Sequence, residues 1–183
     1  KKMYVKLSSY SAYCLLCENH LIPAFGEVYD INEELVQQYV LNEFNNGLNE
    51  KTIKDILIVL KMILRFGVKN NMIDFHQIDI KFPTNHEKKN IEVLSRDNQR
   101  KLMDYVHENF TFKNLGIYIC LCTGMRIGEL CALRWQDIDM EERVIKVRYT
   151  IQRIYITDEG DKKYTKLILD TPKTKESIRD IPL

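Results

Sequence analysis

The sequence TGMRIGEL, residues 123–130, places Arg126 two residues after a glycine and one helical turn before Glu129. That glycine predicts the end of a buried helix at about residues 115–122, and the segment after it predicts a short helix at about 126–133. A guanidinium at a helix start adds its own donors to the free backbone N–H groups and the helix dipole, which favours a phosphate-like oxyanion. The pattern also fits a surface arginine that hydrogen-bonds a glutamate one turn on, and taken alone it favours this second interpretation.

The chain after residue 139 changes from helical to alternating hydrophobicity, which is typical of strands. Upstream of this region, Ser95 predicts the start of a helix and Trp135 is expected in the core. The expected elements are a strand at 144–149 continuing through 151–156, a turn at 158–161, a returning strand at 165–169, and a second turn at 173–175 leading into 178–183. These elements predict a small antiparallel sheet packed on helices.

Residues 1–80 are predicted to form a small all-helical bundle. The expected helices run from Ser8 or Ser9 to about Asn19, ended by Pro23 and Gly26; from Asn32 to before Asn45; and from Asn49 to Gly67. Periodicity fails after Asp79, and the polar residues 81–92, which include Pro83, predict an interdomain linker before a second domain at 93–183. The predicted fold class is therefore α+β overall.

Composition is that of an ordinary globular protein and leaves the function open. The 183 residues are 45% hydrophobic and 29% charged, with a net charge of +1. The longest uncharged run, residues 114–125, is too short to span a bilayer, and no secretory signal precedes it, so we expect a cytoplasmic protein without a membrane partner. A chain that opens on Lys1 and stops on Leu183 is expected to be a piece of a longer protein.

The five cysteines are odd in number and lie within apolar runs, which predicts reduced and mostly buried thiols. Cys14-x-x-Cys17 with His20 nearby offers a zinc interpretation, but no second ligand pair follows at finger-like spacing. The same spacing also fits a core-facing helical stripe. We therefore expect no metal and no other cofactor.

Two sequence boxes resemble those of the tyrosine recombinases, the integrase-type family. Residues 123–139 are similar to its T-G-x-R-x-x-E-L segment followed by L-x-W-x-D-I-D, and residues 171–183 to its T-K-T-x-x-S-x-R-x-I-P-L hairpin. The first half is similar to the family's SAM-like core-binding domain. The resemblance covers nearly the whole chain, is strongest toward phage and conjugative-transposon integrases, and implies a DNA-binding domain at 1–80. It also implies that 93–183 are the N-terminal part of a mixed α+β catalytic domain.

The resemblance also implies residue roles. Arg126 would stabilise the scissile phosphate, Glu129 would support it, and Lys173 would protonate the leaving 5′-oxygen as general acid. Lys175 competes for the role of general acid because the register of the turn is open by a residue or two. Gly128 is expected where backbone segments pack closely. Further DNA contacts are expected from Lys51, Lys88, Lys89, Lys175 and Arg179.

The family's remaining catalytic groups do not occur in these 183 residues. A His-x-x-Arg box and a nucleophilic tyrosine should follow the second box, yet all four histidines precede Arg126, and Tyr155 and Tyr164 lie on expected strands. We therefore expect the chain to bind double-stranded DNA as a monomer without cleaving it. The intact protein would integrate a mobile element through a 3′-phosphotyrosyl intermediate, as a tetramer on DNA. Two rivals remain: a recombinase-derived DNA-binding module or regulator without activity, and an α+β interaction domain.

Overall fold

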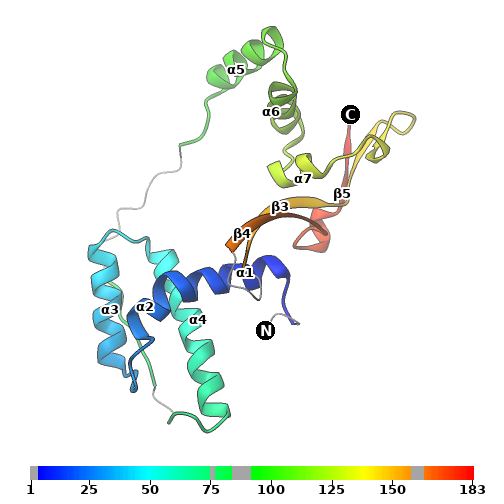
Figure 1. The fold of residues 1–183 in the computed structure, drawn as a ribbon. Helices are drawn as coiled ribbons and strands as arrows, with labels where there is room; N and C mark the ends of the chain where they lie inside the picture. Colours follow the sequence, from blue (N-terminus) through cyan, green and yellow to red (C-terminus); the bar gives the residue numbers. More distant parts are fainter. Residues whose placement is uncertain (1–3, 75–76, 84–91, 158–162) are drawn as a thin grey trace. The chain divides into compact units, whose positions relative to one another are not determined.

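The computed structural model describes residues 4–74, 77–83, 92–157 and 163–183. The chain forms two compact units, Lys1–Lys89 and Asn90–Leu183. Figure 1 shows helices in the first unit and a combination of helices and two small sheets in the second. The predicted α+β fold class is confirmed. Within the described ranges, no helix is long and apolar enough to cross a membrane.

The first unit is helical, as predicted, but the helical stretch that starts at Leu7 continues through three successive elements and ends later than the sequence suggested. The prediction that this helix ends near Asn19 is wrong, because Pro23 falls in the first turn of a following helix, where its missing N–H needs no partner. The chain therefore stays helical as far as Phe25 (Figure 1). The elements are α1 (Leu7–Leu16), the π-helical turn η1 (Cys17–Leu21), α2 (Ile22–Phe25), α3 (Glu33–Asn45) and α4 (Glu50–Lys69).

Apolar stripes on α3 and α4 form the core of the first unit. Asn32 and Asn49 cap these helices as predicted, with side-chain oxygens that accept backbone N–H bonds of 3.0 and 2.8 Å. On α4, Ile63 is 48% exposed, whereas the next residue, Leu64, packs against this core. Four side chains are completely buried at 0% exposure: Val36, Val40, Ile53 and Ile56.

An extended segment, residues 77–82, is fastened along the first unit. The side-chain amide of Gln37 bonds the backbone of Lys81 twice, accepting from its N–H and donating to its carbonyl oxygen, both at 2.9 Å. Phe82 packs against the core, and the ammonium of Lys54 lies 5.0 Å from the centre of its ring. Lys81 and Phe82, which fall inside the expected linker, are thus attached to the first unit.

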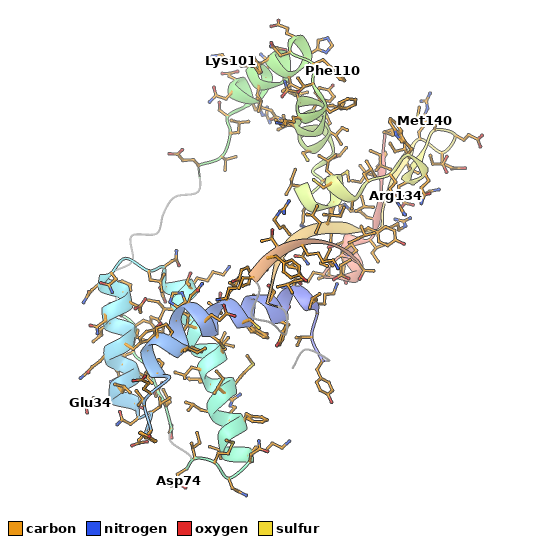
Figure 2. All side chains as sticks on the ribbon, in the orientation of Figure 1. Glu34, Asp74, Lys101, Phe110, Arg134 and Met140 are labelled. Atoms are coloured by element: carbon orange, nitrogen blue, oxygen red, sulfur yellow. The ribbon has the colours of Figure 1, made fainter. Side chains whose placement is uncertain are left out.

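The second unit begins with three helices, α5 (Arg96–Glu108), α6 (Phe112–Thr123) and α7 (Ile127–Ala132). Ser95 caps α5 as predicted, accepting from the Asn98 N–H at 3.2 Å. The prediction of a buried helix at 115–122 is wrong, because α6 has no buried residue, and Ile117 is 44% exposed. Helix α6 packs against α5 and α7, which cover only part of its apolar surface. Figure 2 shows Phe110 at the connection between α5 and α6.

The strands form two antiparallel sheets where the sequence predicted one. The expected long strand divides between Val147 and Thr150. Arg148, at the division, donates to the Arg179 carbonyl oxygen at 3.0 Å and so holds this part of the chain against the last strand. The expected turn at 158–161 lies outside the described residues. The sheets are β1 (Ile138–Asp139), β2 (Val144–Val147) and β5 (Arg179–Pro182) in the order β1-β2-β5, and β3 (Thr150–Thr157) paired with β4 (Lys163–Asp170).

Two predictions about buried side chains are wrong. Trp135 is 88% exposed, because the short turn that begins there instead buries the carboxylate of Asp137, which accepts from the Arg134 N–H and Nε at 3.0 and 3.1 Å. None of the five cysteines is buried, since they lie on helices that are covered on one side only. Cys14, Cys17 and Cys120 are partly exposed, and Cys122 and Cys131 are exposed.

Candidate phosphate-binding site

Arg126 precedes α7 directly and presents its guanidinium to solvent. Gly124 ends α6 in the left-handed conformation, with φ 66°, as its type predicted. Met125, between the two, is only 5% exposed and fixes the loop in the core. The Arg126 side chain is 70% exposed. An exposed guanidinium is therefore carried on a backbone that is anchored in the core.

Helix α7 lies directly against β3 (Figure 1). A Cβ added at Gly128 would stand 2.6 Å from the hydroxyl oxygen of Thr150 and 2.8 Å from the carbonyl oxygen of Ile151. Both distances are shorter than a side chain tolerates. The predicted close packing at this glycine is therefore confirmed. The missing side chain lets α7, with Arg126 at its start, lie directly on β3.

Glu129 is the buried centre of the site, at 3% exposure. Its carboxylate accepts from the Arg126 backbone N–H at 3.0 Å and from the Arg126 Nη1 at 2.9 Å. Burial pushes the pKa of Glu129 up, but hydrogen bonds from Arg179 and Arg126 outweigh it and lower that pKa to about 2. Glu129 is therefore ionised at neutral pH and holds the Arg126 side chain from beneath.

Arg179, on β5, supplies the second cation at this carboxylate. Its Nη1 donates to Oε1 of Glu129 at 3.2 Å and its Nη2 to Oε2 at 2.9 Å, a forked ion pair between residues 50 positions apart. The Arg179 side chain is 30% exposed. The sequence suggested a DNA contact for Arg179, and that role stays a prediction. The contact with Glu129 was not predicted.

The segment that carries Lys173 is tied to the same network. Arg126 Nη1 donates to the Ser177 hydroxyl at 3.4 Å, and the hydroxyls of Ser177 and Thr174 are 3.2 Å apart. Lys173, the neighbour of Thr174, is exposed. It lies in a connection from β4 to β5, two strands of different sheets, and not in the tight hairpin turn that the sequence predicted.

The remaining predicted residues are spread over the chain. Lys51 is exposed in the first turn of α4, in the other unit. Lys175 begins the 3-10 turn η3 (Lys175–Ser177), and its side chain is outside the described part of the structure. Lys88 and Lys89 also lie outside the described residues. Among the described side chains, no three His, Cys, Asp or Glu groups gather to hold a metal ion, and this includes Cys14, Cys17 and His20.

The site that results is a carboxylate between two guanidiniums, with an excess of positive charge. Both side-chain bonds that Arg126 makes to described residues start from Nη1. Its Nε and Nη2 therefore remain, within that part of the chain, available for an oxyanion, and a guanidinium fork matches phosphate geometry. The surface-arginine interpretation does not account for the buried counter-ion or for the second arginine behind it.

Comparisons with known proteins show the family to which the chain is similar. The model of the phage integrase family matches residues 92–171. A XerC-like tyrosine recombinase of Caldanaerobacter subterraneus is 32% identical over 155 residues, which are 81% of this chain and 39% of the relative. The transposase from transposon Tn916 of Enterococcus faecalis is 24% identical over 151 residues, 80% of this chain and 35% of the relative. The chain thus spans well under half the length of these curated relatives.

A solved structure has the same fold over almost the whole chain. It is the Tn1549 transposon integrase in complex with transposon right end DNA, with a TM-score of 0.72 and 23% identity over 98% of this chain and 56% of that one. The family model spans the first sequence box, and the similar recombinases cover most of the chain. The chain belongs to the phage integrase family of tyrosine recombinases.

Proposed function

We propose that this chain is the DNA-binding and partial catalytic portion of a site-specific recombinase that integrates a mobile element. The observation that carries the proposal is the exposed guanidinium of Arg126, held from beneath by buried, ionised Glu129. Only Nη1 of Arg126 bonds described residues, so the rest of a guanidinium fork that matches phosphate geometry faces solvent. The Tn1549 transposon integrase and the Tn916 transposase, to which this chain is similar, are proteins of such elements.

In this proposal, residues 1–80 are the core-binding domain and residues 93–183 the N-terminal part of the catalytic domain, joined by residues 81–92. Arg126 stabilises the charge that develops on a scissile phosphate as it becomes pentacoordinate. Lys173 protonates the leaving 5′-oxygen, and Lys175 is the alternative. The chemistry needs neither metal nor nucleotide, because arginines supply the positive charge.

The nucleophile and the second arginine box are not among these 183 residues. We infer that the chain by itself binds duplex DNA as a monomer and does not cleave it. A polypeptide that also contained these groups would join DNA to tyrosine through a 3′-phosphotyrosyl bond and would act as a tetramer on DNA. Lys51, Lys88, Lys89, Lys175 and Arg179 are the further candidates for contact with phosphates.

Duplex binding over a salt series tests the proposal on the chain itself. The affinity for a mixed-sequence duplex, measured by fluorescence anisotropy, should fall with salt at a slope of about −0.9 in log–log units for each phosphate contact. Lys51→Gln and Lys173→Gln should each flatten the slope by about one contact, whereas Lys101→Gln, an exposed lysine on α5 (Figure 2), serves as the matched control. An affinity that does not change with salt would show an interaction domain instead.

A second candidate is a recombinase-derived module that binds DNA and never cuts it. The Arg126 guanidinium would serve it equally, because binding a phosphate requires no nucleophile. Sequencing the coding region past codon 183 separates the two. An in-frame His-x-x-Arg box and tyrosine support the enzyme, and a stop codon supports the module.

A further inference from the structure

Two arginines share the Glu129 carboxylate unequally. Arg179 gives two side-chain bonds, of 3.2 and 2.9 Å, one to each oxygen. Arg126 gives only one, from Nη1 to Oε1 at 2.9 Å, while its backbone N–H donates to Oε2 at 3.0 Å. Each oxygen therefore accepts two bonds, and a carboxylate has about four acceptor sites in total. The acceptor capacity of Glu129 is filled.

The two arginines also differ in how firmly they are held. Arg179 is 30% exposed, belongs to β5 opposite Val147, and donates a further bond of 3.1 Å to the Ser177 carbonyl oxygen. Arg126 is 70% exposed, and its second side-chain bond, to the Ser177 hydroxyl, is long at 3.4 Å. Arg179 is thus the more buried and more firmly bonded of the two cations, and Arg126 is the more exposed one.

A carboxylate with open acceptor sites draws both ends of a nearby guanidinium fork, because the bidentate pair is the stronger arrangement. Without Arg179, the inner sites of Glu129 would be open to Arg126 alone. Arg126 would then turn a second nitrogen inward and lose the donors it presents to solvent. The pair would also be neutral, whereas two arginines around one glutamate leave a positive charge for an anion.

We propose that Arg179 is a positioning residue of the phosphate site: it occupies the inner side of the Glu129 carboxylate and so limits Arg126 to one side-chain contact. The remaining donors of Arg126 stay directed toward the phosphate. The inference rests on the proposed function for its meaning, since it assumes that Arg126 binds phosphate. It gives Arg179 a role through Glu129, which does not depend on any direct contact of Arg179 with DNA.

The test uses NMR of the 183-residue chain with and without substitutions at Arg179. In Arg179→Gln, the Arg126 guanidinium should gain a second protected nitrogen, and the pKa of Glu129 should rise from about 2 toward its ordinary value of 4.5. Arg179→Lys keeps the charge but not the fork, so the Glu129 pKa should stay low while Arg126 still turns inward. Arg134→Gln, which removes a similar ion pair to Asp137 elsewhere in the unit, is the matched control and should change neither signal.

The proposal is overturned if Arg126 keeps a single protected nitrogen in folded Arg179→Gln, or if Arg134→Gln produces the same change as Arg179→Gln. Should Arg179→Gln fail to fold, Arg179→Lys carries the same measurement, and unchanged Arg126 signals there overturn the proposal. These spectra need no DNA. Failure of this inference is therefore distinct from failure of the proposed function, which the salt series in duplex binding measures.

Discussion

Glu129→Gln is the substitution that most directly probes how the site is held together. The carboxylate accepts four hydrogen bonds of 3.0, 2.9, 3.2 and 2.9 Å from Arg126 and Arg179, and the side chain is 2% exposed. Glutamine keeps the shape but has one acceptor oxygen in place of two. Its amide donors would face the guanidinium donors of both arginines, and neither arginine would retain a counter-ion here.

Removal of one partner from a buried ion pair costs about 3–5 kcal/mol. The lower end of that range applies, because Arg126 is 70% exposed and water solvates and screens its guanidinium. A domain of this size shifts its Tm by about 4–8 °C for each kcal/mol, so a loss of about 3 kcal/mol lowers the Tm of the second unit by at least about 12 °C. The unfolding free energy of a whole domain is about 5–15 kcal/mol, so this loss is a large share of it.

Thermal unfolding followed by circular dichroism, with peptide-resolved hydrogen exchange on α7 and β5, measures the effect. Glu142→Gln, which removes the same charge from an exposed side chain in the same unit, is the control and should shift Tm little. The pH dependence gives an independent check. The folded-state pKa of Glu129 is lowered to about 2 from 4.5, so its contribution to stability is present above pH 4.5 and is lost as pH falls toward 2. The stability gap between wild type and Glu129→Gln should therefore close over this range. If Glu129→Gln lowered the unfolding free energy at pH 7 by less than about 1 kcal/mol, the size of one ordinary hydrogen bond, Glu129 would not be the buried counter-ion that holds the site together.

Two further substitutions test how the units are built. Gly128→Ala should lower the unfolding free energy of the second unit by about 1–3 kcal/mol, because the new Cβ would lie 2.8 Å from a β3 carbonyl oxygen. Gly116→Ala is the control, because its Cβ would meet only a leucine methyl group, at 3.0 Å. Urea unfolding should show that Gly116→Ala is tolerated. Gln37→Ala should speed tryptic cleavage after Lys81, because it removes both hydrogen bonds that hold the Lys81 backbone. Gln38→Ala, at an exposed position, is the control. Equal cleavage rates in the two variants would contradict the attachment of residues 77–82 through Gln37.

The sequence predicted the local features of the fold well, because these depend on residues close together in the chain. Three predicted helix caps are found in the structure, at Asn32, Asn49 and Ser95. Gly124 adopts the left-handed conformation that ends α6. Burial was predicted less well. Trp135 was assigned to the core from its type, yet the turn around it buries an aspartate that pairs with its neighbour. Periodicity reports an apolar face and does not report what covers it.

The candidate site was predicted in part, and the missing part is its long-range contacts. The pairing of Arg126 with Glu129 followed from their spacing along a helix start. The contact of Arg179 with Glu129 did not follow from local spacing. It depends on the pairing of β5 with β2, which joins residues far apart in the sequence. The one available signal was the arginine in the second box, and the sequence alone placed it on DNA. The structure places it against a carboxylate 50 positions earlier in the chain, and its contact with DNA stays a prediction.

The role proposed for Arg126 is to act on a phosphate and not merely to stabilise the fold. Its most direct test is the cleavage of a nicked suicide duplex by a polypeptide that continues from residue 183 through a His-x-x-Arg box and a tyrosine. We expect a covalent protein–DNA adduct when Arg126 is present. With Arg126→Ala we expect no adduct, although the duplex is bound with nearly the same affinity. Loss of binding and adduct together, or an adduct that forms normally without Arg126, would contradict it.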